Sequence, residues 1–301
     1  MPPESSAPAE HLEPSPNAVG FSLSFVEGKG VLGLGPRRLG ALLTCERLEL
    51  EIPGLTFPFD VSGGAGRFQS RRCAVRQARL TLDEGPLAAH LARDPRVAAA
   101  GFGGLEARLR DGGVELAGRV RLGDAAAELT ARGYLVPEGA RGLRLALGEV
   151  RLFGALPVAA VVVGRRLLEA LAAGLAGARL AGAADLVLDP LDEVLFALLP
   201  PCGWRLPDAA GAALTDARIE GGRLELVYGH GPAWAAAPPP RFRAHHAAAL
   251  RFAALEEQLG AAPPWEAQAG YRAALAEHGD DPLLVERLLD LLAAATNGGA
   301  T

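Results

Sequence analysis

The residues from Gly28 to Gly33 read GKGVLG, which is the G-x-G-x-x-G spacing of loops that hold the pyrophosphate of a dinucleotide. That chemistry needs a strand buried on both faces and a helix whose first amides point at the phosphates. Neither requirement is met, because Ser22 and Ser24 give the preceding strand a polar face and Gly35-Pro36 interrupts any helix. We therefore interpret the segment as a glycine-rich turn, and we predict no cofactor.

The histidines show no spacing that supports metal binding. His245 and His246 are adjacent in the sequence, and neighbouring side chains on a helix point about 100° apart. The pair cannot hold one metal ion without further ligands from elsewhere in the chain. We interpret both as solvated surface histidines and predict no metal site.

A group of carboxylates is the remaining candidate for acid/base chemistry or metal binding. It comprises Asp185, Asp189, Asp192 and Glu193. Negative charge at a helix N-terminus and exposure to solvent explain Asp192 and Glu193 without catalysis. Since the chain also contains no H-E-x-x-H or G-x-S-x-G motif, we predict that it is not an enzyme.

Composition excludes several classes of protein. Half of the residues are hydrophobic and 22% are charged, which is typical of a globular chain. The 30 Lys and Arg residues against 35 Asp and Glu residues give a net charge of −5, so nucleic acid is not an expected partner. The three cysteines are far apart and odd in number, which argues against a disulfide framework or a zinc site.

No targeting or membrane-spanning segment is evident. The first 17 residues contain Glu4, Glu10 and Glu13 and no basic stretch followed by an apolar one, so we expect a disordered leader and a cytoplasmic protein. The most apolar stretch, Leu152 to Val163, is well short of the ~20 residues that cross a bilayer. The protein could still lie peripherally at the inner face of a membrane.

Alternating apolar residues predict strands before residue 83. The segments are Phe21 to Phe25, Leu48 to Ile52, Leu55 to Val61 and Val75 to Leu82, with Gly54 as a turn. We expect the row Leu55, Phe57, Phe59 and Val61 to face the interior with Leu116, Val120 and Leu145. Glu49 and Glu51 are expected on the polar side.

Further strands and helices follow. A short helix is predicted from Pro86 to Arg93, and the alternation between Leu105 and Leu152 predicts an antiparallel meander with hairpins at Asp111-Gly112-Gly113 and Gly123-Asp124. The apolar positions change parity after Gly148, which predicts a bulge there.

The meander is followed by an amphipathic helix, predicted from Pro157 to about Leu180. A strand from Asp185 to Leu188, a helix from Leu191 to Leu199 and a hairpin at Gly221-Gly222 complete this part of the chain.

The apolar period becomes helical after a proline-rich segment. We expect helices from Arg243 to Leu259, Trp265 to His278 and Pro282 to Ala295. The predicted organisation is a leader at 1–18, a β-rich domain at 19–229, a linker at 230–240, a helical module at 241–296 and a disordered tail at 297–301.

The long alternating sheet and its amphipathic helix allow two interpretations. Their interface could be packed solidly, which would make the chain a structural or interaction scaffold with a dry core. It could instead leave a seam lined by Leu, Val and Ala, and such a seam suits acyl chains because apolar burial needs little specific chemistry.

The order of these elements resembles the tubular lipid-binding (TULIP) superfamily, which includes the bactericidal/permeability-increasing proteins and bacterial relatives. The passage LELEIPG…FPFDVSGG, from Leu48 to Gly64, is similar to their strand, Ile-Pro turn and strand. The resemblance covers about Gly20 to Gly229. It departs from the family in having only a short early helix, about Pro36 to Leu43, and no secretory signal or paired cysteines.

The resemblance implies an α+β fold in which a curved antiparallel sheet wraps a long amphipathic helix, with a phospholipid or fatty acyl chain bound or transferred in the seam and no catalysis. The residues expected to contact lipid are Leu55, Phe57, Phe59, Val61, Leu116, Val120, Leu122, Leu145, Leu147, Leu168, Leu171 and Leu175.

The C-terminal region resembles a single tetratricopeptide repeat. Ala267, Tyr271, Ala274 and Pro282 have the spacing of the second helix of such a repeat, where small residues let paired helices approach. One repeat cannot bury its own apolar face. We therefore expect residues 241–296 to contact a protein partner, a second copy or the first domain.

Overall fold

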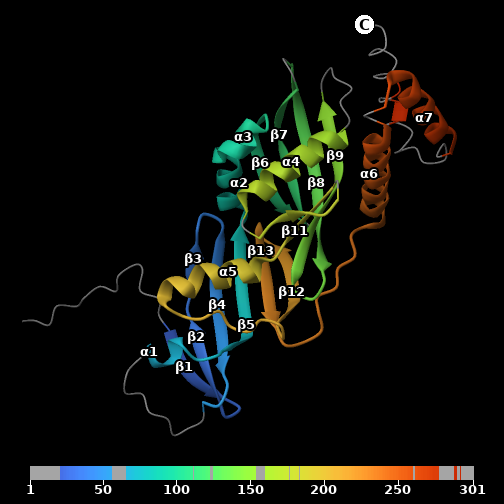
Figure 1. Cartoon of the computed structure of the whole chain (residues 1–301). Coiled ribbons are helices and arrows are strands. Elements are labelled where there is room, and N and C mark those ends of the chain that lie inside the picture. Colours follow the sequence, from blue (N-terminus) through green and yellow to red (C-terminus); the bar gives the residue numbers. More distant parts are fainter. Residues whose placement is uncertain are drawn as a thin grey trace, which may run out of the picture.

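The computed structural model describes residues 21–55, 66–110, 112–122, 125–153, 160–175, 177–182, 184–259 and 262–277, together with residues 288, 289 and 292. These residues form two antiparallel sheets and several helices, so the chain is an α+β protein. In Figure 1 the first sheet occupies the lower half of the picture and the second sheet the upper half. The two sheets contribute to one continuous hydrophobic core.

The first sheet combines strands from both ends of its region of the chain. Its spatial order is β1 (Phe21–Val26), β2 (Lys29–Leu34), β4 (Leu43–Ile52), β5 (Ala74–Asp83), β13 (Arg223–Gly229) and β12 (Ala213–Glu220), and β3 (Arg37–Leu39) also pairs with β4. The pairing of β13 with β5 joins segments that are about 140 residues apart, with Leu224 opposite Leu82 and Leu226 opposite Leu80.

The second sheet is built from one continuous stretch of sequence. Its order is β10 (Arg179–Leu180), β11 (Asp185–Leu188), β9 (Gly142–Phe153), β8 (Ala125–Glu138), β7 (Gly113–Leu122) and β6 (Phe102–Arg110). The predicted meander is therefore confirmed. The alternation exists because one face is buried: Leu105, Leu109, Leu129 and Leu143 are each at most 2% exposed.

The helices lie outside the sheets. They are α1 (Gly66–Gln69), α2 (Glu84–Arg93), α3 (Pro95–Ala99), α4 (Ala160–Gly174), α5 (Pro190–Leu198), α6 (Pro240–Leu259) and α7 (Pro264–Glu277), with a 3-10 turn at Pro200–Cys202. In Figure 1, α4 crosses in front of the second sheet and α5 crosses in front of the first. The structure does not confirm a single curved sheet wrapped around one long helix.

Gly148 forms the bulge that the change of parity predicts. Glu149 pairs with Arg132 and Leu147 pairs with Gly133, so Gly148 has no partner on β8. A bulge bends its strand and re-aims the following side chains. The apolar positions therefore shift from Leu147 to Val150 across it, and both are buried.

Two predicted helices differ from the structure. The prediction of a short helix from Pro36 to Leu43 is wrong. Arg37–Leu39 forms β3, which pairs antiparallel with Leu43–Cys45 of β4 around a turn at Gly40. The helix expected to reach Leu180 ends at Gly174. Gly177 takes a positive φ of 72°, and the chain then enters β10.

The glycine-rich segment is a hairpin turn, as interpreted. Glu27 and Gly28 have positive φ values of 53° and 78° and connect β1 to β2. Gly30 is packed so closely that a Cβ there would lie 2.5 Å from Leu55 Cδ2. The glycines thus serve a turn and a close approach in a strand, and no helix begins within them.

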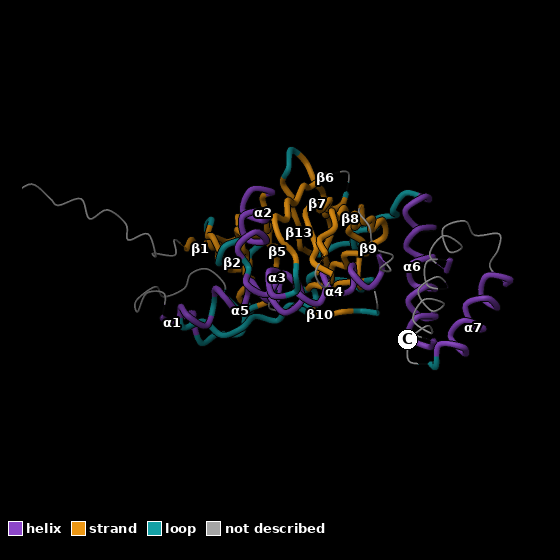
Figure 2. The backbone as a smooth tube through the Cα atoms, turned by 90° about the horizontal axis from the view of Figure 1, so that it is seen from above, coloured by secondary structure: helices purple, strands orange, loops and turns teal. Residues whose placement is uncertain are grey.

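The C-terminal helices lie beside the second sheet. Figure 2 shows α6 next to β9, with α7 on its far side. Phe242 packs on Tyr134 and Ala146, while Ala267, Tyr271, Ala274 and Leu288 share a separate small core. Of the third helix expected here, only residues 288, 289 and 292 are described.

Candidate functional site

Rows of leucines from the two sheets enclose a cavity. On the first sheet, Leu43, Leu82 and Leu224 are neighbours across β4, β5 and β13. On the second sheet, Leu135, Leu145 and Leu186 are neighbours across β8, β9 and β11. All six side chains line one hollow of about 280 Å³.

Helices and a hairpin close the sides of this hollow. The described lining residues are Leu39, Gly40, Ala41, Leu42, Leu43, Leu82, Leu87, His90, Leu91, Asp94, Leu109, Val114, Leu116, Leu135, Leu143, Leu145, Leu171, Leu175, Leu186, Leu188, Asp189, Pro190, Glu193, Leu224 and Leu226. We call this hollow the leucine cavity. Gly40 and Ala41, in the turn between β3 and β4, are exposed, so this turn lies at the edge of the cavity.

The composition of the lining explains why space remains. Leucine dominates, and among the described lining residues there is no Phe, Tyr or Trp. Protein interiors normally pack to the density of organic crystals and leave few voids larger than a water molecule. Short branched side chains that face each other across two sheets leave the volume that aromatic rings would otherwise fill.

The residues expected to contact lipid are divided by the structure. Leu116, Leu145, Leu171 and Leu175 line the leucine cavity. Leu55, Val120, Leu147 and Leu168 are buried in the core without lining it. Phe57, Phe59 and Val61 lie outside the described residues, as does the side chain of Leu122.

Sequence reasoning missed the contributions of the first sheet and of α2. Leu82, Leu224 and Leu226 show the same alternation as the meander, so the burial of Leu224 and Leu226 and the partial burial of Leu82 could be predicted. Their place in the cavity depends on the pairing of β13 with β5, which local periodicity does not reveal. The hairpin residues Leu39 to Leu43 were missed because that segment was predicted to be helical.

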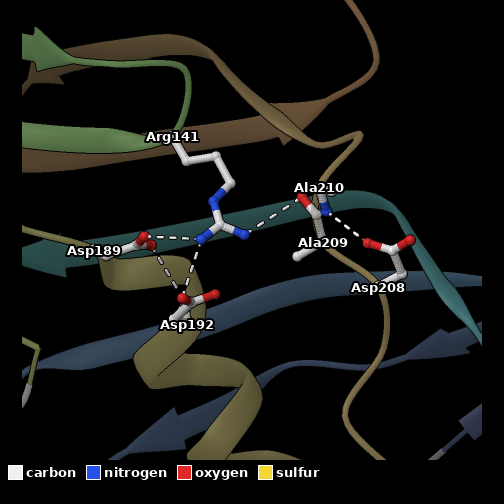
Figure 3. A network of polar contacts seen from close by, with 6 residues as sticks. All are labelled: Arg141, Asp189, Asp192, Asp208, Ala209 and Ala210. Carbon is white, nitrogen blue, oxygen red and sulfur yellow. Dashed lines mark hydrogen bonds and ion pairs between the residues drawn. The ribbon is translucent and has the colours of Figure 1, made fainter.

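Arg141 binds Asp189, one of the carboxylates that line the cavity. Its Nη2 donates to Asp189 Oδ2 at 3.1 Å and to Asp192 Oδ2 at 3.0 Å, and its Nη1 donates to the carbonyl of Ala209 at 3.4 Å (Figure 3). Asp189 Oδ1 also accepts the backbone N–H of Asp192 at 3.3 Å, which caps α5. The carboxylates of Asp189 and Asp192 are therefore structural partners of Arg141.

Asp94 is a second lining carboxylate whose oxygens already have partners in the protein. Its Oδ1 accepts the backbone N–H of Arg96 at 2.8 Å and the Arg96 guanidinium at 3.2 Å, and its Oδ2 lies 3.6 Å from His90 Nε2. The hydrogen bond from the Arg96 backbone, with the Arg96 side chain and His90, holds the pKa of Asp94 below its ordinary value despite burial. Asp94 thus caps α3 beside the cavity.

Glu193 is the lining carboxylate without such partners. Within the described part of the chain, its side chain makes no hydrogen bond or ion pair. Burial raises the pKa of Glu193, because the ionised carboxylate loses hydration there. It lies in the first turn of α5, where the helix dipole favours negative charge.

His246 is not a solvated surface histidine, contrary to the expectation from sequence. Its side chain is 17% exposed, its Nδ1 lies 2.8 Å from the carbonyl of Leu147, and its Nε2 lies 3.2 Å from Asp185 Oδ1. The cause is the docking of α6 on β9, which brings segments about 100 residues apart together. Asp185 is also 3.6 Å from Arg144 and is buried.

Glu49 is likewise not on an open polar face. It is 9% exposed, its carboxylate is paired with Arg47, and its Oε2 lies 3.7 Å from Arg76. Two neighbouring guanidinium groups cover this side of the sheet, so strand alternation alone misjudged its exposure.

Comparisons of the chain with protein-family models, with curated proteins and with solved structures gave no match. Within the described residues, no three His, Cys, Asp or Glu side chains are grouped so that they could hold a metal ion. The described helices are all too short or too polar to cross a membrane.

Proposed function

We propose that this protein binds an apolar small molecule, a lipid or fatty acyl chain, in the leucine cavity and that its function is to hold or transfer that molecule without catalysis. The observation that carries this proposal is an apolar hollow of about 280 Å³ between two leucine-rich sheets. An apolar hollow with a few polar groups at its border is the usual form of a small-molecule site. The resemblance to the tubular lipid-binding superfamily gives the same function and remains a prediction.

The size of the cavity favours one chain over two. Small-molecule sites enclose roughly 300–1,000 Å³, and 280 Å³ lies just below that range. A single aliphatic chain matches this volume better than a phospholipid with two acyl chains. Apolar burial at ~25 cal/mol per Å² supplies the affinity without any directional contact.

Two leucines on neighbouring strands provide a matched test. Leu143 on β9 lines the cavity and Leu129 on β8 does not, and each is 1% exposed. In Leu143→Phe the ring fills the hollow, so we expect near wild-type stability and loss of binding of a neutral fluorescent naphthylamine probe. In Leu129→Phe we expect overpacking to cost about 1–3 kcal/mol while the probe still binds.

Native mass spectrometry of the purified chain, beside its denatured mass, provides an independent measurement. Extra mass that extracts into organic solvent supports the proposal. An unliganded mass after incubation with mixed lipids, together with no probe binding and equal destabilisation by the two Phe variants, would instead favour a scaffold with a dry core.

A further inference from the structure

The polar groups that border the leucine cavity carry information about the ligand's head group. The described lining residues with ionisable side chains are His90, Asp94, Asp189 and Glu193, and no Arg or Lys is among them. Three of the four are carboxylic acids. A fatty acid carboxylate or a phosphate head would therefore meet like charge and find no guanidinium or ammonium in the lining.

Two of these carboxylates already accept hydrogen bonds from other groups of the protein. Asp189 accepts Arg141 at 3.1 Å and the backbone N–H of Asp192 at 3.3 Å (Figure 3). Asp94 accepts the backbone and side chain of Arg96 and has His90 at 3.6 Å. Neither needs a ligand to satisfy its charge.

Glu193 differs from both. Its side chain is half-buried at the start of α5, lines the same hollow as the leucines, and has no partner within the described part of the chain. A half-buried carboxylate without a partner is costly unless an opposite charge or donor is supplied. A ligand that carries an ammonium group would supply both the charge and the donors.

We propose that the cavity binds an amphiphile with one aliphatic chain and a primary ammonium head, the chain lying among the leucines and the head pairing with Glu193. The inference rests on the proposed function, since it assumes that the leucine cavity holds a ligand. The inference adds the charge of the ligand's head group, which the leucines of the lining do not specify.

The test uses three ten-carbon probes that differ only in their head groups: decylamine, 1-decanol and decanoate. They are titrated by calorimetry into the full chain at neutral pH, below their aggregation thresholds. We expect decylamine to bind about tenfold or more tightly than decanol, as a charge-assisted contact provides, and decanoate to bind more weakly than decanol.

Two variants locate the effect. Glu193→Gln should reduce decylamine affinity to that of decanol and leave decanol affinity unchanged, which also shows that the variant is folded. Asp192→Asn is the control, because Asp192 is adjacent on α5 but does not line the cavity. It should retain the preference for decylamine.

The outcomes separate the two proposals. If none of the three probes binds, the proposed function fails together with this inference. If decanol or decanoate binds as well as decylamine, or if Glu193→Gln keeps the preference for the amine, the inference fails and the proposed function stands.

Discussion

Phe242, in the first turn of α6, packs directly against Gly148, the bulged residue of β9. A Cβ on Gly148 would lie 2.4 Å from Phe242 Cε2, closer than any real contact of that kind. The Phe242 ring also lies 4.4 Å from the ring of Tyr134. The bulge thus creates the space into which the C-terminal helix inserts its aromatic side chain.

The contact between Phe242 and Gly148 predicts the effect of one added methyl group. Gly148→Ala should displace the ring and lower the free energy of unfolding by about 1–3 kcal/mol, as overpacking does. Gly103→Ala is the matched control, because a Cβ at Gly103 on β6 meets no atom within 4 Å. Urea melts measure both variants, and equal midpoints would show that Phe242 does not depend on Gly148.

Docking of α6 should depend on pH through His246. Burial alone would lower the pKa of His246, but hydrogen bonding to Asp185 and to the Leu147 carbonyl, with the charge of Asp185, raises it above its ordinary 6.5 despite the opposing charge of Arg144. The stabilisation is therefore fully present below pH 6.5 and is lost as pH rises through the higher folded value.

The measurement compares the full chain with a chain that ends at Pro238, in urea melts at several pH values. The difference in unfolding free energy should fall as pH rises from 6 to 9, and in His246→Gln it should be independent of pH. A difference that grows with pH in the unaltered chain would contradict the assignment.

Arg141 should contribute more to stability than an exposed arginine does. Arg141→Met leaves Asp189 and Asp192 without their shared guanidinium, and we expect a loss of about 1 kcal/mol, because solvent partly screens this group, whose side chain is 26% exposed. Arg165→Met is the control, since Arg165 forms one exposed pair with Glu169 and should change stability by less than ~0.5 kcal/mol. Thermal melts compare them.

The chain that ends at Pro238 should fold by itself and bind the naphthylamine probe as the full chain does. No described residue beyond Leu226 lines the leucine cavity, and Trp234, whose backbone N–H donates to the Leu214 carbonyl at 2.6 Å, is retained. Removal of α6 uncovers Tyr134 and Ala146, so a modest loss of stability is expected. A molten or insoluble product would show that residues beyond 238 belong to the same core.

Local patterns in the sequence predicted most strands but not every pairing between them. The alternation around Leu129 and Leu143 reflects one buried face, which any sheet pairing preserves. The helix that the resemblance implied from about Pro36 to Leu43 is instead a hairpin, in which Arg37–Leu39 pairs with Leu43–Cys45 of β4.

The apolar character of the candidate site could be predicted from the sequence, but its position in the fold could not. Apolar rows with few aromatic residues indicated a possible seam, and Leu116, Leu145, Leu171 and Leu175 do line the cavity. Its other wall depends on β13 beside β5, and its charge depends on Glu193, which sequence reasoning explained by a helix N-terminus and exposure to solvent. Contacts over such separations leave no local periodicity to detect.

The position of β13 beside β5 also governs the order in which the chain can assemble during synthesis. The second sheet occupies residues 102–188 and can form as soon as that stretch is available. The first sheet keeps β5 as an open edge until residue 229 has been made. The second sheet can therefore be complete before the first sheet is closed. In that interval the edge of β5 is unpaired, and it is the surface that a chaperone would have to protect.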